Sequence, residues 1–279
     1  MTQMKKFLGK GTWTVSLVVL SLLSLVPFLW MISTSLKTRA EVFTYPPVFI
    51  PEVPQWDNYI QVFQAFPFAR YALNTAFVTV TVTVFQTLTS AMAAYAFARL
   101  VFPGRDRLFL LYLGTLMIPG VVTLIPSYIL MTDKFLGWID TFAALIVPAS
   151  LGGAFNTFLI RQFFLSLPRE LEDAALIDGA TPFQIFFRIT LPLSKSILAI
   201  VSIFVFMGTW NSFLWPLLMM STPEKQVLTV GLAAMQGRWN TRWPELMAGT
   251  LMSIAPIILL LILFQRYVEE GLSFTGIKT

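Results

Sequence analysis

The sequence of 279 residues contains no cysteine and no histidine. These absences exclude disulfide bonds, thiol nucleophiles, histidine-based metal sites and proton relays that use an imidazole. Charged residues are also scarce, since they make up 12% of the chain where soluble domains have about a quarter. With 56% hydrophobic residues and a mean hydropathy of +0.74, the composition predicts an all-α integral membrane protein.

Six long stretches contain no Asp, Glu, Lys or Arg, and we expect each to cross the membrane as a helix. Residues 12–36 are longer than a signal-peptide core and no small-residue cleavage site follows them, so we interpret them as a retained span. Residues 12–279 are expected to form one transmembrane domain after a cytoplasmic N-terminus, residues 1–11. The six predicted spans are residues 12–36, 71–98, 108–131, 141–160, 196–220 and 246–264.

Helix-breaking residues interrupt two of these stretches. Pro119 and Pro126 lie in the third, where prolines free backbone carbonyls and bend a helix. Pro148 and the Gly152–Gly153 pair make a weak point in the fourth. The segment 37–70 is rich in proline and aromatic residues, and we expect it to be a folded external loop.

The distribution of Lys and Arg predicts the orientation of the chain. Twelve of the 19 basic residues lie in the N-terminus and in the segments after the second, fourth and sixth spans. The positive-inside rule therefore places both termini and the segment after the fourth span in the cytoplasm. The net charge of +5 follows from this topology, because the basic residues lie at span ends and form no stripe for nucleic acid.

The most polar interruption between spans is residues 166–192, SLPRELEDAALIDGATPFQIFFRITLP. Pro168 and the acidic residues of 170–173 suit the first turn of a short helix, where the helix macrodipole stabilises negative charge. Gly179 is expected to end this helix in the left-handed conformation. Thr181 is expected to cap a second helix that begins at the following proline. The segment therefore predicts a helix-turn-helix that faces water.

A fixed spacing runs through this segment. Asp173, Ala174 and Ala175 are followed after three residues by Gly179, and the pattern ends Ile189, one residue, Leu191, Pro192. This spacing resembles the EAA loop of permease subunits of bacterial ABC importers, with Asp173 where the family has Glu. In that family the loop is the coupling helix, which docks in a groove of the ATP-hydrolysing subunit. The resemblance implies ATPase coupling by Glu172, Asp173, Ala174, Ala175, Asp178, Gly179, Ile189, Leu191 and Pro192.

The resemblance extends over the rest of the chain. The segments TWNSFLWPLL (209–218), QVLTVGL (226–232) and the run from 243 to 278 are similar to the maltose-type, carbohydrate-importing branch. The branch implies a type I transmembrane domain of six helices in the bacterial cytoplasmic (inner) membrane, for a sugar, an oligosaccharide or a glycerol phosphate ester. It also implies a heterodimer with a second permease subunit, two ATPase subunits that hold ATP and Mg, and an extracytoplasmic solute-binding protein. The loop 221–245 is a candidate contact for that protein.

Polar residues inside the spans are candidates for the solute pathway. Thr75, Thr79, Thr83 and Thr87 fall on one helix face and could line it, although close helix packing is the favoured interpretation. An Asn between tryptophans suits a sugar, because rings stack on its apolar faces and the amide binds hydroxyls. An interhelical hydrogen bond with interfacial anchors is the favoured alternative there. The pathway candidates are Asn74, Thr79, Thr83, Asn156, Trp210 and Asn211.

Two other function classes stay open. The spans lack the ionisable residues that commonly bind or relay a driving ion, yet a channel or secondary transporter working without an ATPase is an alternative. A membrane enzyme would need a nucleophile, a metal or an acid–base pair, and the only clustered carboxylates lie in 166–192. The chain also has no GxxxxGK[ST] phosphate loop. We therefore expect no catalytic residue, no metal and no cofactor on this chain.

Overall fold

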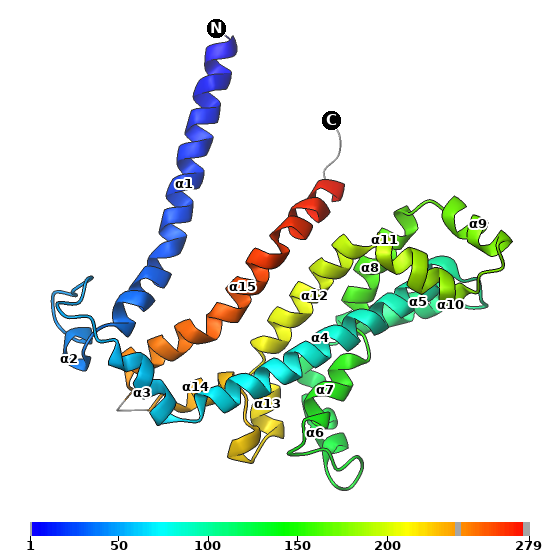
Figure 1. The fold of residues 1–279 in the computed structure, drawn as a ribbon. Coiled ribbons are helices and arrows are strands. Elements are labelled where there is room, and N and C mark those ends of the chain that lie inside the picture. The colour runs from blue at the N-terminus through cyan, green and yellow to red at the C-terminus, as the bar shows by residue number, and fades with distance from the viewer. Residues whose placement is uncertain (1, 238–240, 276–279) are drawn as a thin grey trace. The chain divides into compact units, whose positions relative to one another are not determined.

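The computed structural model describes the backbone of residues 2–237 and 241–275 and the side chains of 13–237 and 241–267. All secondary-structure elements in this part of the chain are helices or helical turns, and it contains no β-strand (Figure 1). The chain forms two compact units. The first joins the chain up to residue 68 with residues 231–255, and the second joins residues 69–230 with the chain from 256 onward.

The first unit contains the N-terminal helix and the segment that follows it. Asn58 holds α3 to the end of α1, because its side-chain amide donates hydrogen bonds to the carbonyls of Ser35 and Lys37, both at 2.9 Å. Residues 13–30 of the apolar part of α1 are exposed, whereas Ser33, Thr34 and Ser35 at its end are buried in this unit. The helices of the unit are α1 (Thr2–Ser35), α2 (Arg39–Val42), α3 (Asp57–Ala65), the end of α14 (Leu228–Ala234) and the first part of α15 (Trp243–Thr275).

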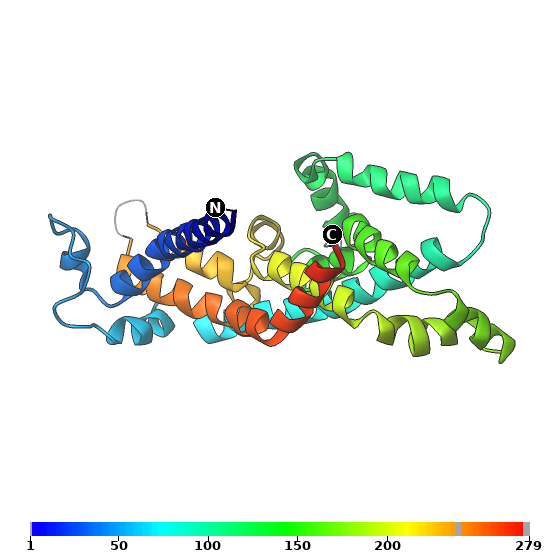
Figure 2. The same ribbon diagram turned by 90° about the horizontal axis from the view of Figure 1, so that it is seen from above.

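The second unit is built around α4 and α8. Helices α5 and α12 pack on α8, and α13 packs on α7. Figures 1 and 2 both show the segment from α9 to α11 projecting from one end of this unit. The helices are α4 (Phe68–Arg99), α5 (Arg105–Gly114), α6 (Gly120–Met131), α7 (Ala143–Ser150), α8 (Ala154–Ser166), α9 (Glu170–Ile177), α10 (Pro182–Ile185), α11 (Leu191–Leu193), α12 (Lys195–Trp210) and α13 (Leu214–Met219), with 3-10 turns η1 (Thr115–Met117) and η3 (Pro223–Lys225) and the π-helical turn η2 (Phe186–Thr190).

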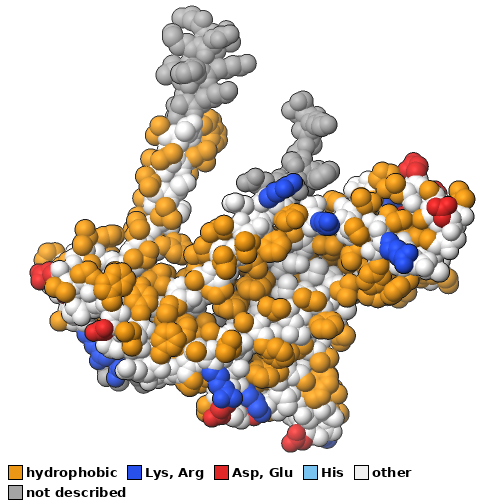
Figure 3. Space-filling view, viewed as in Figure 1, with side chains coloured by type: hydrophobic (Ala, Val, Ile, Leu, Met, Phe, Trp, Pro, Cys, Tyr) orange, Lys and Arg blue, Asp and Glu red, His pale blue; other side chains and the backbone are white. Residues whose placement is uncertain are grey.

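Four helical segments in the described part of the chain are long and apolar enough to cross a membrane. Two helix pairs bent by 98° and 82° raise the number to six if each pair is one span. Hydrophobic side chains cover much of the surface visible in Figure 3, and the charged side chains lie in a few small groups. The four segments are Trp13–Ser35, Phe68–Arg99, Ala143–Ser166 and Trp243–Tyr267, and the bent pairs are Arg105–Met117 with Gly120–Met131 and Pro182–Leu193 with Lys195–Trp210.

Three of the six stretches expected as spans are broken, and two of the breaks lie in the third and fifth stretches. In 108–131 the break falls at Pro119, which caps α6, whereas Pro126 lies inside α6 without ending it. The stretch 196–220 is not one helix, because α12 ends at Trp210 and α13 follows as a separate helix. The Met207 carbonyl accepts from both the backbone amide of Asn211 at 3.1 Å and its side-chain amide at 2.8 Å.

The weak point expected in the fourth span is where the helix breaks. Gly152 has a φ of +90°, a left-handed conformation that side chains disfavour, and Gly153 caps α8 in an extended conformation. Pro148 lies inside α7. Beyond the break, α8 continues to Ser166, six residues past the predicted end of the span at 160.

Candidate functional site

The first helix of the segment 166–192, which we call the coupling loop, ends as its sequence predicts. Helix α9 closes with a Schellman motif, in which the Ala180 amide donates to the Ala175 carbonyl at 2.9 Å and the Gly179 amide to the Leu176 carbonyl at 3.0 Å. Gly179 has a φ of +80° and a Cβ there would meet nothing within 4 Å. The glycine is therefore required by the backbone of the turn and not by crowding inside this chain.

The second helix of the loop is fixed by a capping box. The Thr181 hydroxyl accepts from the Gln184 amide, and the Gln184 side chain accepts from the Thr181 amide at 2.8 Å. Pro182 is the first residue of α10, as predicted. The first helix begins at Glu170, two residues after Pro168, with no side-chain cap. The loop thus has a defined backbone although much of its surface is exposed.

The tip of the coupling loop presents apolar and acidic side chains together. Ile177 is 86% exposed and Leu176 53%, beside exposed Asp173 and Asp178. Figure 3 shows acidic and hydrophobic side chains mixed at the end of the molecule that carries α9. An exposed patch of this kind suits docking to another protein. Of the other predicted coupling residues, Ala174, Gly179 and Pro192 are exposed, and Ala175, Ile189 and Leu191 pack against the core.

Glu172 lies differently from its neighbours, because its carboxylate turns toward the chain's own core. Its Oε1 is 3.1 Å from Nε of Arg99, and the two side chains are 14% and 4% exposed. Burial raises the pKa of the Glu172 carboxyl, and the charge of Arg99 opposes that rise. Sequence reasoning treated Arg99 only as a basic residue of a short loop, since no local pattern links position 99 to position 172.

The two ends of α4 carry different polar segments. At its C-terminal end Arg99 pairs with the coupling loop. At its N-terminal end the side chains of Arg70 and Asn74 donate to the Glu224 carbonyl at 3.0 and 2.9 Å. Helix α4 has 32 residues and is therefore about 48 Å long, more than a hydrocarbon core of about 30 Å. The coupling loop and the turn at η3 therefore lie at opposite ends of a helix that is long enough to cross a membrane.

Asp140 anchors the segment that contains η3. Its carboxylate accepts from the backbone amides of Ser221 and Thr222 at 3.0 and 2.9 Å, and from the ammonium of Lys225 at 3.0 Å. Hydrogen bonds, first from the Thr222 side chain and then from the Thr222 amide and Lys225, hold the pKa of this carboxyl well below its usual range. The start of the candidate binding-protein contact, 221–245, is thus fixed, while residues 238–240 of it lie outside the described residues.

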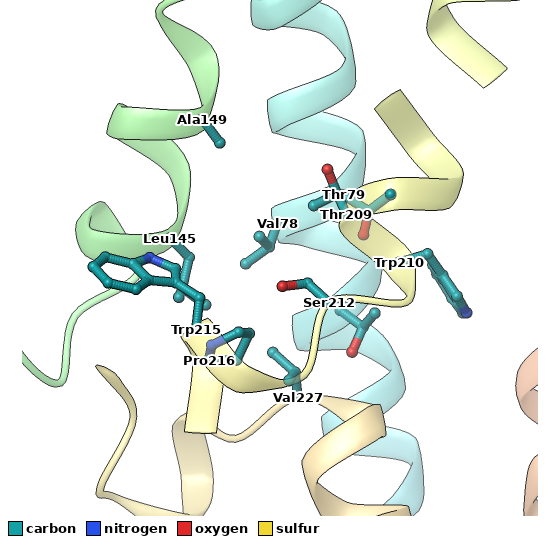
Figure 4. A pocket seen from close by; sticks show the side chains of 12 residues that line it. Val78, Thr79, Leu145, Ala149, Thr209, Trp210, Ser212, Trp215, Pro216 and Val227 are labelled. Atoms are coloured by element: carbon teal, nitrogen blue, oxygen red, sulfur yellow. The ribbon is translucent and has the colours of Figure 1, made fainter. Parts of the chain in front are cut away.

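A partly open cavity of about 160 Å³ lies between α4, α7, α12 and α13 (Figure 4). Thr79 is fully buried at its wall, and its hydroxyl has no hydrogen-bond partner among the described residues. The Thr75 hydroxyl, by contrast, donates to the Tyr71 carbonyl and accepts from the Leu228 amide, each at 2.8 Å. The lining combines hydroxyl-bearing and apolar side chains, among them Thr75, Thr79, Thr209, Ser212, Val78, Leu145, Trp215 and Val227.

Of the Trp210–Asn211 pair, only the tryptophan reaches this cavity. Trp210 contributes to the lining, but Figure 4 shows its ring directed away from the other labelled side chains. The ring stacks on Phe206 with centroids 5.5 Å apart. Asn211 is exposed, and its recorded hydrogen bond is to Met207 of its own helix. Among the described residues Asn211 therefore makes no interhelical hydrogen bond.

The remaining pathway candidates lie outside the cavity. Thr83, one turn from Thr79, has a buried hydroxyl without a partner in the described residues. Asn156 is buried in the first turn of α8 beside Gly153, and Asn74 binds the turn at η3. Trp215, one of the tryptophans that flank Asn211 in the sequence, does line the cavity. Sequence reasoning missed Thr209 and Ser212 as lining residues, although the quoted segment 209–218 contains both.

The chain matches, over residues 12–273, the family described as binding-protein-dependent transport system inner membrane component. It belongs to that family. It is therefore a multi-pass inner-membrane permease component of a binding-protein-dependent ABC importer. The family is one of transport permeases, and the match favours this function over a channel or a secondary transporter.

Relatives and solved structures agree with this assignment. The chain is 35% identical over 268 residues to the arabinooligosaccharides transport system permease protein AraQ of Halalkalibacterium halodurans, covering 95% of both chains. It is 33% identical over 273 residues to the sulfoquinovosyl glycerol transport system permease protein SmoH of Agrobacterium fabrum, covering 98% of this chain and 95% of that one. It is 35% identical over 240 residues to the sn-glycerol-3-phosphate transport system permease protein UgpE of Pectobacterium atrosepticum, covering 83% and 84%.

A solved structure shares the fold of this permease. It is a bacterial ABC transporter involved in the import of the acidic polysaccharide alginate, with a TM-score of 0.83, 26% identity and coverage of 93% of this chain and 96% of that one. The expected fold class, a type I ABC importer transmembrane domain, is confirmed.

Proposed function

We propose that this permease forms half of the translocation pathway of an ATP-driven importer for a sugar or oligosaccharide. Relatives named for arabinooligosaccharides, sulfoquinovosyl glycerol and diacetylchitobiose support a glycoside as the solute. A relative named for sn-glycerol-3-phosphate makes a phosphate ester the second candidate. The chain contributes one coupling loop, which fits one half of a heterodimer with a second permease subunit.

The exposed tip of the coupling loop is the observation that carries this proposal. Its apolar side chains, Leu176 and Ile177, and the acidic Asp173 and Asp178 face away from the core of the second unit. An ATPase groove with a basic rim would bury the former and pair with the latter. Two ATPase subunits would hold ATP and Mg, and their closure would move the loop and open the pathway to alternate sides.

The opposite end of α4 suits the solute-binding protein. Arg70, Asn74 and Asp140 fix the start of the loop 221–245 on that side. If the coupling loop meets a cytoplasmic ATPase, this loop faces outward and both termini lie in the cytoplasm, in agreement with the count of basic residues.

The cavity beside α4 would contact part of the passing solute. Its 160 Å³ is too small for an oligosaccharide, because one water occupies about 30 Å³ in the liquid. The partly exposed hydroxyls of Thr209 and Ser212 can bond a sugar hydroxyl, and the apolar walls can pack on the carbon faces of a ring.

Purification and uptake test the proposal. The tagged permease, isolated from its native membrane, should bring down a second permease and an ATPase. Cells that carry the gene, but not deletion cells, should take up one of four radiolabelled probes: an arabino-oligosaccharide, sulfoquinovosyl glycerol, diacetylchitobiose or sn-glycerol 3-phosphate. Vesicles containing this chain alone that accumulate a probe without ATP would contradict the proposal.

A further inference from the structure

Arg99 is the last residue of α4, and its side chain holds three separate elements. Its Nη2 donates to the carbonyls of Phe164 at 2.6 Å and Leu167 at 2.8 Å, at the end of α8. The last carbonyls of a helix lack donors in their own helix, so the guanidinium acts as a cap for α8. The same group lies 3.1 Å from the carboxylate of Glu172 in the first turn of α9.

This pairing differs from a surface ion pair in its exposure. The Arg99 and Glu172 side chains are 4% and 14% exposed, whereas those of Arg105 and Asp106, at the same end of the unit, are 28% and 74% exposed. A largely buried pair is little screened by salt, and the planar guanidinium can serve carbonyls and a carboxylate at the same time. The Arg99 contact therefore fixes the orientation of α9 against α4 and α8.

An aromatic contact one turn earlier joins the same region. The ring of Tyr95 on α4 lies 6.4 Å from that of Phe164 on α8 and 5.3 Å from that of Phe186 in η2, between ring centroids. Phe164 and Phe186 are 0% and 3% exposed. The coupling loop is thus attached to α4 and α8 at two places. Its first helix is held by the Arg99–Glu172 ion pair, and the part near its end is held by the packed rings of Tyr95, Phe164 and Phe186.

We propose that Arg99 and Glu172 are positioning residues that make the coupling helix move with α4 and α8 as one body. This inference rests on the proposed ATPase coupling. Glu172 then acts inside the permease and not on the ATPase surface, which leaves Asp173 and Asp178 as the acidic groups that face a partner. Without the pair, α9 would still dock, but part of its displacement would be lost between the loop and the spans.

The test uses the complex purified with its native partners in lipid nanodiscs. The chain has no cysteine, so spin labels placed by Met92→Cys on α4 and Leu171→Cys on α9 are the only labels on it, and the partner subunits are used in cysteine-free form. The distance is measured by pulsed electron resonance without nucleotide and with ATP, Mg and vanadate. Glu172→Gln removes the charge with little change of shape, and Glu170→Gln on the exposed side of the same helix is the matched control.

We expect the label distance to stay constant between the two states in the parent protein and in Glu170→Gln. In Glu172→Gln it should shift by about 2 Å, the size of helix shifts in such transitions, with the ATPase still bound. Glu172→Asp keeps the charge, so its label distance should change less between the two states than that of Glu172→Gln. Equal constancy in Glu172→Gln, or loss of the ATPase from that complex, would overturn the inference. A parent permease that binds no ATPase would instead refute the proposed function itself.

Discussion

The turn at Gly179 allows the docking role of the coupling loop to be tested against a matched glycine in the same chain. Gly179 has a φ of +80° and Gly104 a φ of +79°, and a Cβ at either position meets nothing within 4 Å. Gly179→Ala and Gly104→Ala therefore impose the same backbone strain without a clash. They differ in place, because Gly104 precedes α5 in another loop.

The size of the perturbation follows from the conformation. A residue with a Cβ pays about 1–2 kcal/mol in the left-handed region, which corresponds to roughly a 5- to 30-fold change in an equilibrium. If docking requires the Schellman turn that ends α9, the population of permease with the competent turn falls by up to that factor in Gly179→Ala. Gly104→Ala leaves the coupling loop unchanged. Gly179→Asn should recover part of the loss, because Asn tolerates this conformation better than Ala.

The assay is the amount of ATPase retained per permease after purification at limiting ATPase, followed by ATP hydrolysis of the isolated complex. We expect severalfold lower retention for Gly179→Ala, intermediate retention for Gly179→Asn and full retention for Gly104→Ala. Equal loss in both alanine variants would assign the effect to general destabilisation. Full retention in Gly179→Ala would refute the view that the loop docks through this turn. Lower ATPase retention in Gly179→Asn than in Gly179→Ala would indicate that the size of the side chain at this position, and not the backbone conformation, limits docking.

Two further predictions concern the other end and the middle of α4. Thr79→Val removes a buried hydroxyl that has no partner among the described residues, so we expect unchanged or higher thermal stability. Thr209→Val removes a partly exposed hydroxyl from the cavity wall and should slow uptake of the transported probe, whereas Thr83→Val, with the same chemistry outside the cavity, should keep the uptake rate; equal uptake effects of the two would count against a role of the cavity. Asp140→Asn should lower the thermal stability, because Asn fits the φ of +59° but cannot pair with the Lys225 ammonium. Since the folded pKa of Asp140 lies below the ordinary value of about 3.9, its contribution is complete at higher pH and is lost as pH falls through the folded pKa. The difference in melting temperature between parent and Asp140→Asn should stay constant from about pH 8 to 5 and narrow only below about pH 4, and a difference that changes near neutral pH would contradict this assignment.

The sequence predicted best the features that local chemistry determines. Gly179 as a left-handed stop, Thr181 as a cap and the helix break at Gly152 need only the residue and its neighbours. The absence of charge over long stretches likewise indicated where long apolar helical segments lie, without knowledge of their packing.

Features that depend on contacts far apart in the chain could not be predicted. The pairing of Arg99 with Glu172 and the binding of Asn74 to the Glu224 carbonyl join segments separated by tens of residues. The end of α12 at Trp210 was missed because apolar composition continues through 220. Hydropathy records which residues suit lipid and carries no information on where a backbone bends.

Helix α4 connects the features that the proposed mechanism needs. Asn74 holds the turn at η3, Thr79 lines the cavity and Arg99 meets the coupling loop. From Phe68 to Arg99 it contains no proline and no glycine, unlike every other span or bent pair in the described residues. The 20 residues between Thr79 and Arg99 extend about 30 Å as unbroken helix, so a displacement at the coupling loop reaches the cavity without a hinge. We therefore expect the bending that alternate access requires to occur in the other helices, which break at Pro119 before α6, at Gly152 before α8 and after Trp210 at the end of α12.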